Sequence, residues 1–211
     1  MKLIKIYLLT IFSFLLFTPS LLSRASTDLD SNLTPRGYPD VVLKRLSPTL
    51  KEYLLNEDKL LFLDSSLASN STSINHPKLD WVYSAVYNEN NKIELIDVIY
   101  LYEWDKLPLW RLQDKISVSW EKSDFSIKTD SFVKVDFYDT LSTNANIHSF
   151  EAGYAQASPS NIYWYANLKG NYFTFVTKLY GYAQFELVPT ESVMSEVPIL
   201  IAQYNHDTVI K

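Results

Sequence analysis

Apolar and polar residues alternate with a period of two through much of the chain after Leu79. Between residues 116 and 120, for example, Ile116, Val118 and Trp120 alternate with serines. Successive side chains of a strand point to opposite faces, so this pattern predicts strands with one buried face. About nine such segments, separated by turn residues, predict an antiparallel β-sandwich or flattened barrel with a short N-terminal helical segment. The predicted strands are 60–63, 81–87, 93–104, 116–120, 125–127, 133–137, 162–169, 172–188 and 199–204, with 150–157 a weaker candidate.

The turn sequence Asn-Glu-Asn-Asn at residues 88–91 lies between the predicted strands 81–87 and 93–104. Asparagine tolerates positive φ, so we expect a β-hairpin here. The three predicted strands between residues 116 and 137 follow one another closely, which predicts a meander. In its last strand the apolar residues alternate with Lys134 and Asp136.

The pair Gly170-Asn171 predicts a second hairpin, formed by 162–169 and 172–188. In that register one face is apolar and the other is rich in tyrosine. Gly181, inside the long second strand, indicates a bulge or bend. The final apolar run, 199–204, is expected at a sheet edge.

The helical segment is expected at residues 39–55, where apolar residues recur at three- and four-residue spacing. Pro48 interrupts the pattern, so we expect two short helices, the second with Ser47 as its N-cap and Pro48 at its first position. Residues 26–38 are polar and read as a flexible leader. One β-rich domain is therefore expected over 39–211.

Residues 1–25 have the pattern of a cleavable secretory signal peptide. Two lysines lie among the first five residues, residues 6–22 are almost wholly apolar, and Ser23-Arg24-Ala25 has small residues at both ends of an A-x-A-like site. A retained membrane anchor is the alternative, but the run is shorter than the roughly 20 residues of a spanning helix. We expect cleavage after residue 25, a secreted or extracytoplasmic product, and no membrane association afterwards.

Composition narrows the classes of partner. Removal of residues 1–25 takes away three cations and no acid, so the net charge moves from −5 to −8. An acidic protein without a basic cluster is not expected to bind nucleic acid. The chain has no cysteine, which excludes both disulfides and a lipoprotein anchor and leaves the core to stabilise the fold. Fifteen lysines against four arginines, with no cysteine, favour a bacterial exported protein.

Metal and cofactor sites are not indicated. The histidines His76, His148 and His206 lie in separate polar segments without a ligand spacing, which disfavours zinc. Asp28, Asp30 and Asn32 resemble the start of a calcium loop, but the glycine and closing glutamate of such a loop are missing. We expect neither a metal nor a cofactor.

The candidate ligand-binding residues are aromatic. In the register of the predicted last hairpin, Tyr163 and Tyr165 point to the same polar face as Tyr180 and Tyr182. A tyrosine side chain can stack on a glycan or contact a protein partner. The alternative is that these rings pack in the core. Trp104 and Trp110 bracket a short turn that either grips a ligand or closes the end of the core; with the tyrosines they complete the candidate set.

Catalysis has weaker support. The chain has no cysteine and no G-x-S-x-G sequence, and although His206-Asp207 and a serine could assemble in space, the sequence does not show it. A glycosidase needs two carboxylates opposed across a cleft. Of the acids on or near strands, Asp97 stands out because Leu95 and Ile99 flank it on its own face; an ion pair with a lysine is its alternative role. The full set is Glu94, Asp97, Glu103, Asp105 and Glu121.

Three function classes follow. The leading hypothesis is an exported, non-catalytic binding domain that engages an extracellular glycan or protein partner through an aromatic sheet face. The rival is a secreted hydrolase acting on polysaccharide or cell wall with paired carboxylates. The third is a membrane-active, pore-forming protein, because the alternating strands 116–137 resemble pore-lining strands.

Overall fold

The computed structural model describes residues 28–67, 77–104, 113–120, 125–140, 147–152, 156–158, 160–167, 176–190 and 198–206. The predicted signal peptide, residues 1–25, lies outside this set. The chain divides into two units, residues 1–60 and 61–211, a division that the sequence did not indicate. Within the described residues, no helix combines the length and the apolar character needed to cross a membrane.

The first unit contains the helices. Residues 28–33 are helical, followed by the 3₁₀ helix η1 (Thr34–Arg36) and the α-helices α3 (Asp40–Leu43) and α4 (Pro48–Asn56). The two short helices predicted around Pro48 are confirmed. Ser47 caps α4 as expected, because its side chain accepts a hydrogen bond from the Leu50 amide at 3.3 Å.

The helical turn at residues 28–33 differs from the flexible leader expected over 26–38. Leu33 is fully buried, and the carboxylate of Asp30 pairs with the ammonium of Lys51 at 2.6 Å. The guanidinium of Arg36 donates to the backbone carbonyls of Leu54, at 2.7 Å, and Glu57, at 2.9 Å, near the end of α4. Helix ends leave carbonyls without intrahelical partners, so a cation there is favourable. These contacts are not local in sequence, which is why composition alone suggested a loose segment.

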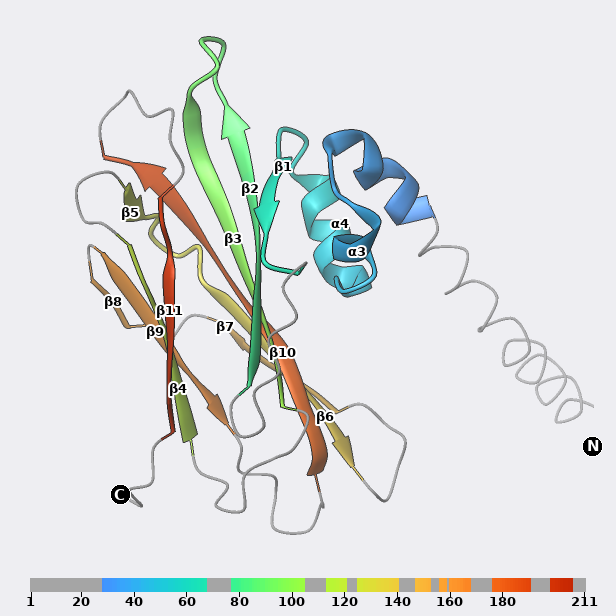
Figure 1. Cartoon of the computed structure of the whole chain (residues 1–211), viewed down its shortest axis with the longest axis vertical. Helices are drawn as coiled ribbons and strands as arrows, with labels where there is room; N and C mark the ends of the chain where they lie inside the picture. The colour runs from blue at the N-terminus through green and yellow to red at the C-terminus, as the bar shows by residue number, and fades with distance from the viewer. Residues whose placement is uncertain are drawn as a thin grey trace, which may run out of the picture. The chain divides into compact units, whose positions relative to one another are not determined.

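The second unit consists of two antiparallel sheets (Figure 1). The larger, which we call the seven-stranded sheet, has the order β1-β2-β3-β10-β6-β7, with β5 also paired to β10. The smaller, the four-stranded sheet, has the order β11-β4-β9-β8. The bounds are β1 (Leu61–Ser65), β2 (Lys78–Tyr87), β3 (Ile93–Trp104), β4 (Gln113–Ser119), β5 (Phe125–Ile127), β6 (Val133–Thr140), β7 (Ile147–Ala152), β8 (Gln156–Ser158), β9 (Asn161–Asn167), β10 (Val176–Pro189) and β11 (Ile201–His206).

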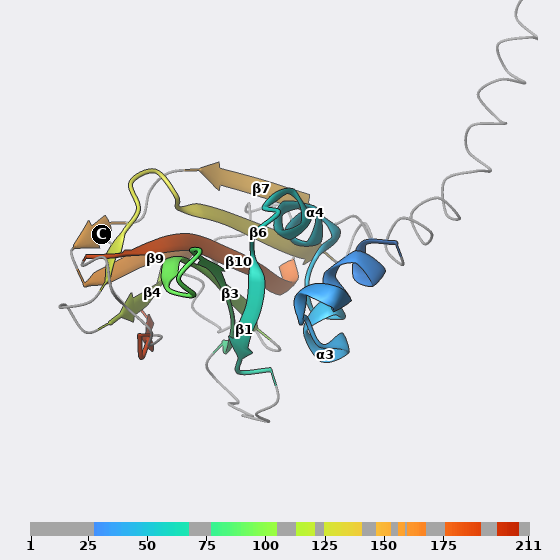
Figure 2. The same cartoon turned by 90° about the horizontal axis from the view of Figure 1, so that it is seen from above.

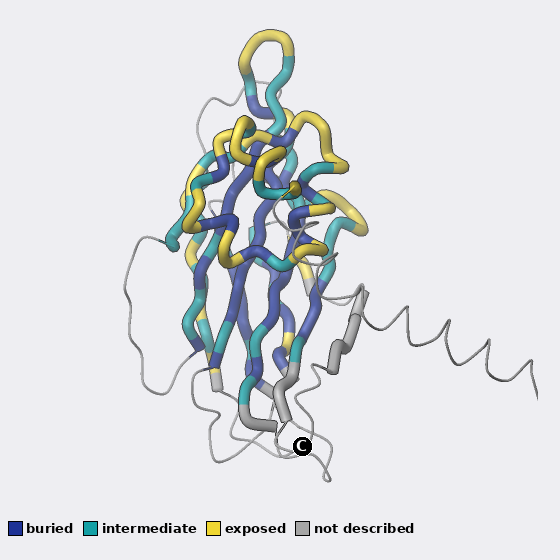
Figure 3. Tube along the Cα trace, turned by 90° about the vertical axis from the view of Figure 1, so that its right-hand side faces the viewer, coloured by how far each residue is buried: buried dark blue, intermediate teal, exposed yellow. Residues whose placement is uncertain are grey.

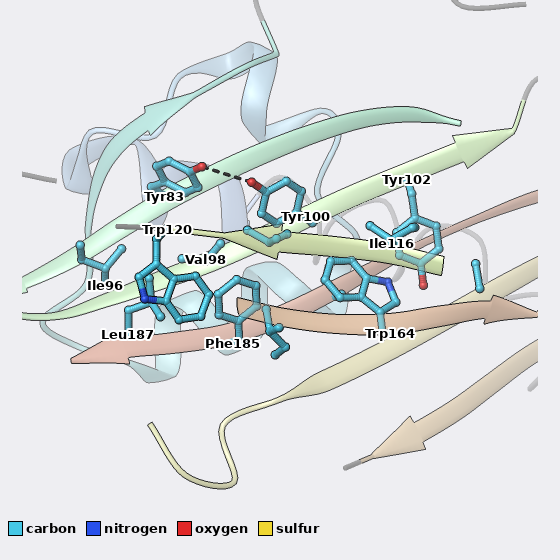
Figure 4. Packing of buried hydrophobic residues seen from close by; sticks show 14 of the residues in the cluster. Tyr83, Ile96, Val98, Tyr100, Tyr102, Ile116, Trp120, Trp164, Phe185 and Leu187 are labelled. Atoms are coloured by element: carbon cyan, nitrogen blue, oxygen red, sulfur yellow. Dashed lines mark hydrogen bonds between the residues drawn. The ribbon is translucent and has the colours of Figure 1, made fainter. Parts of the chain in front are cut away.

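The two sheets pack face to face over one hydrophobic core, which confirms the predicted sandwich (Figure 2). The ring of Tyr100 on β3 lies 6.2 Å from that of Trp164 on β9, measured between centroids. Trp120, just after β4, stacks on Phe185 of β10 at 6.2 Å. Figure 4 shows these rings between the two layers. Since each pair joins a residue of one sheet to a residue of the other, the aromatic residues hold the sandwich together.

The hairpin between β2 and β3 is confirmed. The side-chain oxygen of Asn88 accepts hydrogen bonds from the Asn90 and Lys92 amides at 2.9 and 3.0 Å, and Asn91 has φ of 57°. Residues 89–91 are exposed, at the top of Figure 3, whereas much of the strands below is buried. A register shift after Val86 places Ile93 on the core face, opposite to the face expected from a regular hairpin.

The meander predicted over 116–137 is wrong. β4 pairs with β9 and β11 in the four-stranded sheet, whereas β5 and β6 pair with β10 in the other sheet. The chain therefore changes sheets after Trp120, whose indole nitrogen donates to the carbonyl of Phe125 at 2.9 Å across this crossing. The strands themselves were predicted correctly, and so was β11 at a sheet edge.

The prediction that residues 162–169 and 172–188 pair as a hairpin is also wrong, because β9 and β10 lie in different sheets. The Gly170-Asn171 turn lies outside the described residues. β10 instead runs between β3 and β6 at the centre of the seven-stranded sheet. The prediction of which side chains of each strand share the apolar face was nevertheless right, since Trp164 on β9 and Phe185 on β10 both point into the core.

Gly181 marks a close contact and not a bulge. β10 is in regular register with both neighbours at this residue, and its irregularity lies between Val176 and Lys178. A Cβ at position 181 would lie 2.3 Å from the carbonyl oxygen of Val135 and 2.7 Å from a ring carbon of Tyr102. Glycine is therefore required here for space, because the Tyr102 ring lies across the strand.

Candidate functional site

The outward side chains of the four-stranded sheet form a partly exposed surface, which we call the Tyr163–Tyr165 face. Their neighbours along each strand, such as Ile116, Ile162 and Trp164, belong to the core, so the alternate residues point away from it. The register places Lys115 between Tyr165 and Asn205 in one row. The face comprises Lys115, Ser117 and Ser119 on β4, Asn161, Tyr163 and Tyr165 on β9, and Ile201, Gln203 and Asn205 on β11.

Two tyrosine rings and one ammonium group form the middle of this face. The rings of Tyr163 and Tyr165 meet edge to face, with centroids 5.9 Å apart and planes at 89°. The ammonium of Lys115 lies 3.7 Å from the centroid of the Tyr163 ring, a cation–π contact. Tyr165 is 41% exposed. The arrangement offers ring surface, hydroxyls and one cation to a ligand in solvent.

Tyr180 and Tyr182 lie on the outward side of the other sheet, because β10 is not paired with β9. Tyr182 is buried, and burial raises the pKa of its hydroxyl. Tyr180 is half-buried and stacks on Phe137, with centroids 5.1 Å apart. The single four-tyrosine surface predicted from the sequence is therefore wrong: two of its members share the Tyr163–Tyr165 face and two are packed within the seven-stranded sheet.

Trp104 is a core residue. It is 1% exposed, and its ring lies edge-on to those of Tyr102, at 5.8 Å, and Tyr204, at 6.3 Å. Of the two roles considered for this tryptophan, the structure shows the one in which the ring closes the end of the core. Trp110 lies outside the described residues.

The acids considered for hydrolysis do not face one another where the structure describes them. Asp97 is fully buried, and its carboxylate accepts a hydrogen bond from the Gln184 amide at 2.7 Å. Glu103 is paired with Lys178 at 2.5 Å. Asp97 and Glu103 lie six residues apart on one face of β3, which separates them by about 20 Å. Glu94 is exposed, whereas Asp105 and Glu121 lie outside the described residues.

A buried ion pair lies beneath the Tyr163–Tyr165 face, and the sequence did not predict it. The ammonium of Lys134 is 2.9 Å from the carboxylate of Asp136 and donates to the backbone carbonyl of Tyr165 at 2.7 Å. The hydroxyl of Tyr102 donates to the same carboxylate at 2.6 Å. Lys134 and Asp136 are opposite Ala183 and Gly181 in the register with β10, so they point into the core and not to solvent.

The only sequence signal for this pair was the opposite charge of residues 134 and 136. The alternate residues of this strand are apolar: Val133, Val135 and Phe137. The sequence pattern therefore indicated that the two charged side chains face solvent. Val135 is in fact buried as well, at 8% exposed. When both faces of a strand are buried, alternation does not identify the one that faces the partner sheet.

A further buried carboxylate lies on the core side of the four-stranded sheet. Asp114 on β4 is fully buried and accepts a hydrogen bond from the Tyr204 hydroxyl of β11. Burial raises the pKa of Tyr204, and the hydrogen bond to Asp114 and its charge act in the same direction. On the other side of the core the hydroxyls of Tyr83 and Tyr100 lie 3.4 Å apart, and burial raises the pKa of Tyr100 to about 12.

Within the described part of the chain, no three His, Asp or Glu side chains gather closely enough to hold a metal ion. Comparison with models of protein families, with curated proteins and with solved structures gave no match. The site is therefore interpreted from its own chemistry.

Proposed function

We propose that the protein is an exported, non-catalytic binding domain that engages an extracellular glycan through the Tyr163–Tyr165 face. The observation that carries the proposal is the composition of that face. It presents two tyrosine rings, one lysine, and amide and hydroxyl side chains, with Tyr165 substantially exposed.

The chemistry of the face favours binding over hydrolysis. Among its residues that the structure describes there is no carboxylate, so it lacks the acid and base of a glycosidase. Asp114 and Asp136 point into the core between the two sheets, whereas Asp97 is buried on the outward side of the seven-stranded sheet beside Gln184. None of these three carboxylates belongs to the Tyr163–Tyr165 face.

The polarity of the face favours a glycan over a protein partner. The centre of a protein interface is usually more apolar than the rest of the surface. Apart from Tyr165, the exposed large apolar side chains near this face are Ile201, 55% exposed, on the edge strand β11, and Ile199, 79% exposed, just before it. Gln203 and Asn205 are exposed amides, which hydrogen-bond sugar hydroxyls, while a tyrosine ring supplies an apolar surface with a polar tip.

Export is part of the proposal and rests on the pattern of residues 1–25. N-terminal sequencing of the product released by an expressing cell is expected to begin at Ser26. Recovery of the intact chain in the membrane fraction would contradict cleavage.

Binding is tested by screening the purified protein on a glycan array and repeating the screen with Tyr165→Ala. Loss of the exposed ring should weaken binding by roughly 1–3 kcal/mol and leave the free energy of unfolding nearly unchanged. Tyr182→Ala is the matched control, since truncating a ring buried in the seven-stranded sheet should cost roughly 3–5 kcal/mol of stability. Unchanged glycan binding by Tyr165→Ala would rule out this face as the site.

A further inference from the structure

Lys115 lies at the centre of the Tyr163–Tyr165 face. It is on β4, which has β9 on one side and β11 on the other. Its register partners are Tyr165 and Asn205, and its ammonium lies over the ring of Tyr163 at 3.7 Å. A ligand that covers both rings must therefore also cover this cation.

The charge of Lys115 is not neutralised by an acid of the described residues. Lys178, on β10, and Lys128, just after β5, each have their ammonium 2.5 Å from a glutamate carboxylate. Lys115 instead contacts the face of an aromatic ring, and no carboxylate described by the structure is within ion-pair distance of it. An ammonium has three N–H donors. The ring contacts the ammonium from one side, so donors on the opposite side remain available to a ligand.

The surroundings of Lys115 favour an anion. The described residues of the face include no acid, although the whole chain carries a net charge of −5. At physiological ionic strength charges interact over about 8 Å, so the nearest groups dominate. An anionic ligand is attracted to this face and repelled by acidic surface elsewhere, which also orients it.

We propose that the glycan bound here is an acidic polysaccharide, and that Lys115 binds the carboxylate of a uronic acid unit. This inference rests on the proposed function and makes it more specific. The carboxylate accepts hydrogen bonds from the ammonium, while the sugar ring lies against Tyr165 and its hydroxyls reach the amides of Gln203 and Asn205.

The test compares each acidic polysaccharide with its own uncharged methyl ester. Polygalacturonate, alginate and hyaluronate are each titrated against the purified protein by calorimetry, beside the methyl ester of the same polymer. We expect the protein to bind at least one acid form with an affinity ten or more times higher than that for its ester. Added salt should weaken binding of the acid form and not that of the ester. Lys115→Gln should lower affinity for the acid to that for the ester. Lys178→Gln, on the other sheet, is the matched control and should change neither.

Three outcomes contradict the inference. If an acid and its ester bind equally and Tyr165→Ala abolishes both, the uronic acid assignment is wrong and the proposed function stands. A sulfated galactan is titrated in the same way. If it binds as tightly as the best uronic acid polymer, the face recognises negative charge in general and not a sugar carboxylate. If no acidic or neutral polysaccharide binds at all, the inference and the proposed function both fail.

Discussion

Removing the ammonium of Lys134 should be among the most destabilising single changes in the sandwich. The side chain of Lys134 is 3% exposed and that of Asp136 is 1% exposed. In Lys134→Ala the carboxylate of Asp136 stays in the core with the Tyr102 hydroxyl as a donor. The carbonyl of Tyr165 loses the ammonium that now joins the two sheets.

The magnitude follows from the cost of an uncompensated buried charge. Breaking a buried ion pair by removing one partner costs about 3–5 kcal/mol, most of it from the charge left behind. Replacing both partners with apolar side chains of similar size, as in Lys134→Met with Asp136→Leu, leaves no such charge. That double change removes the carboxylate to which the Tyr102 hydroxyl donates at 2.6 Å, and leaves this hydroxyl its longer contacts to the backbone carbonyls of Val135, at 3.4 Å, and Tyr182, at 3.5 Å. We expect this change of acceptor to cost roughly 1 kcal/mol. The double variant is therefore expected to be more stable than Lys134→Ala.

Urea denaturation followed by tryptophan fluorescence measures these differences, because Trp164 and Trp104 are buried in the core. The slope of the free energy against urea should match that of the parent protein, so that midpoints report stability. The double-variant cycle also needs the two single variants Lys134→Met and Asp136→Leu. The reasoning fails if Lys134→Ala costs less than about 1 kcal/mol and the effects of Lys134→Met and Asp136→Leu are additive, since close, buried partners are coupled by roughly 0.5–3 kcal/mol.

Three further predictions concern other parts of the fold. Gly181→Ala should destabilise by roughly 1–3 kcal/mol or more in the same urea titration, because its Cβ would lie 2.3 Å from the Val135 carbonyl oxygen; an unchanged midpoint would contradict the close approach. The free energy of unfolding should fall as the pH rises from about 10, the ordinary pKa of tyrosine, towards about 12, the raised pKa of Tyr100. The unfolded state loses this proton first, so ionisation favours unfolding; Tyr100→Phe should flatten the alkaline loss, and an equal loss in that variant would refute the assignment. Ser47→Ala should cost about 1 kcal/mol by removing the α4 cap, measured by thermal unfolding against Thr49→Ala, an exposed residue of the same helix; a cost matching that of the control would count against the cap.

Local sequence signals determined the strands and several of their ends. The turn at residues 88–91 and the N-cap at Ser47 were predicted because they depend on residues close together in the chain. Strand parity is also local, since the side-chain period of a strand is two. For this reason Tyr163 and Tyr165 were correctly placed on the side of β9 that faces away from the apolar residues.

Only the tertiary structure decided which strands pair and which faces meet. β9 and β10 are consecutive along the chain and share the expected parity, yet each pairs within a different sheet, so Tyr165 and Tyr182 end on opposite sides of the sandwich. Likewise, the pattern around Lys134 identified two faces of β6 without showing which one faces the core. Pairing and burial depend on contacts between residues far apart in sequence, such as Lys134 with the Tyr165 carbonyl. No local alternation encodes such a contact, because it forms only when the two sheets close over a common core.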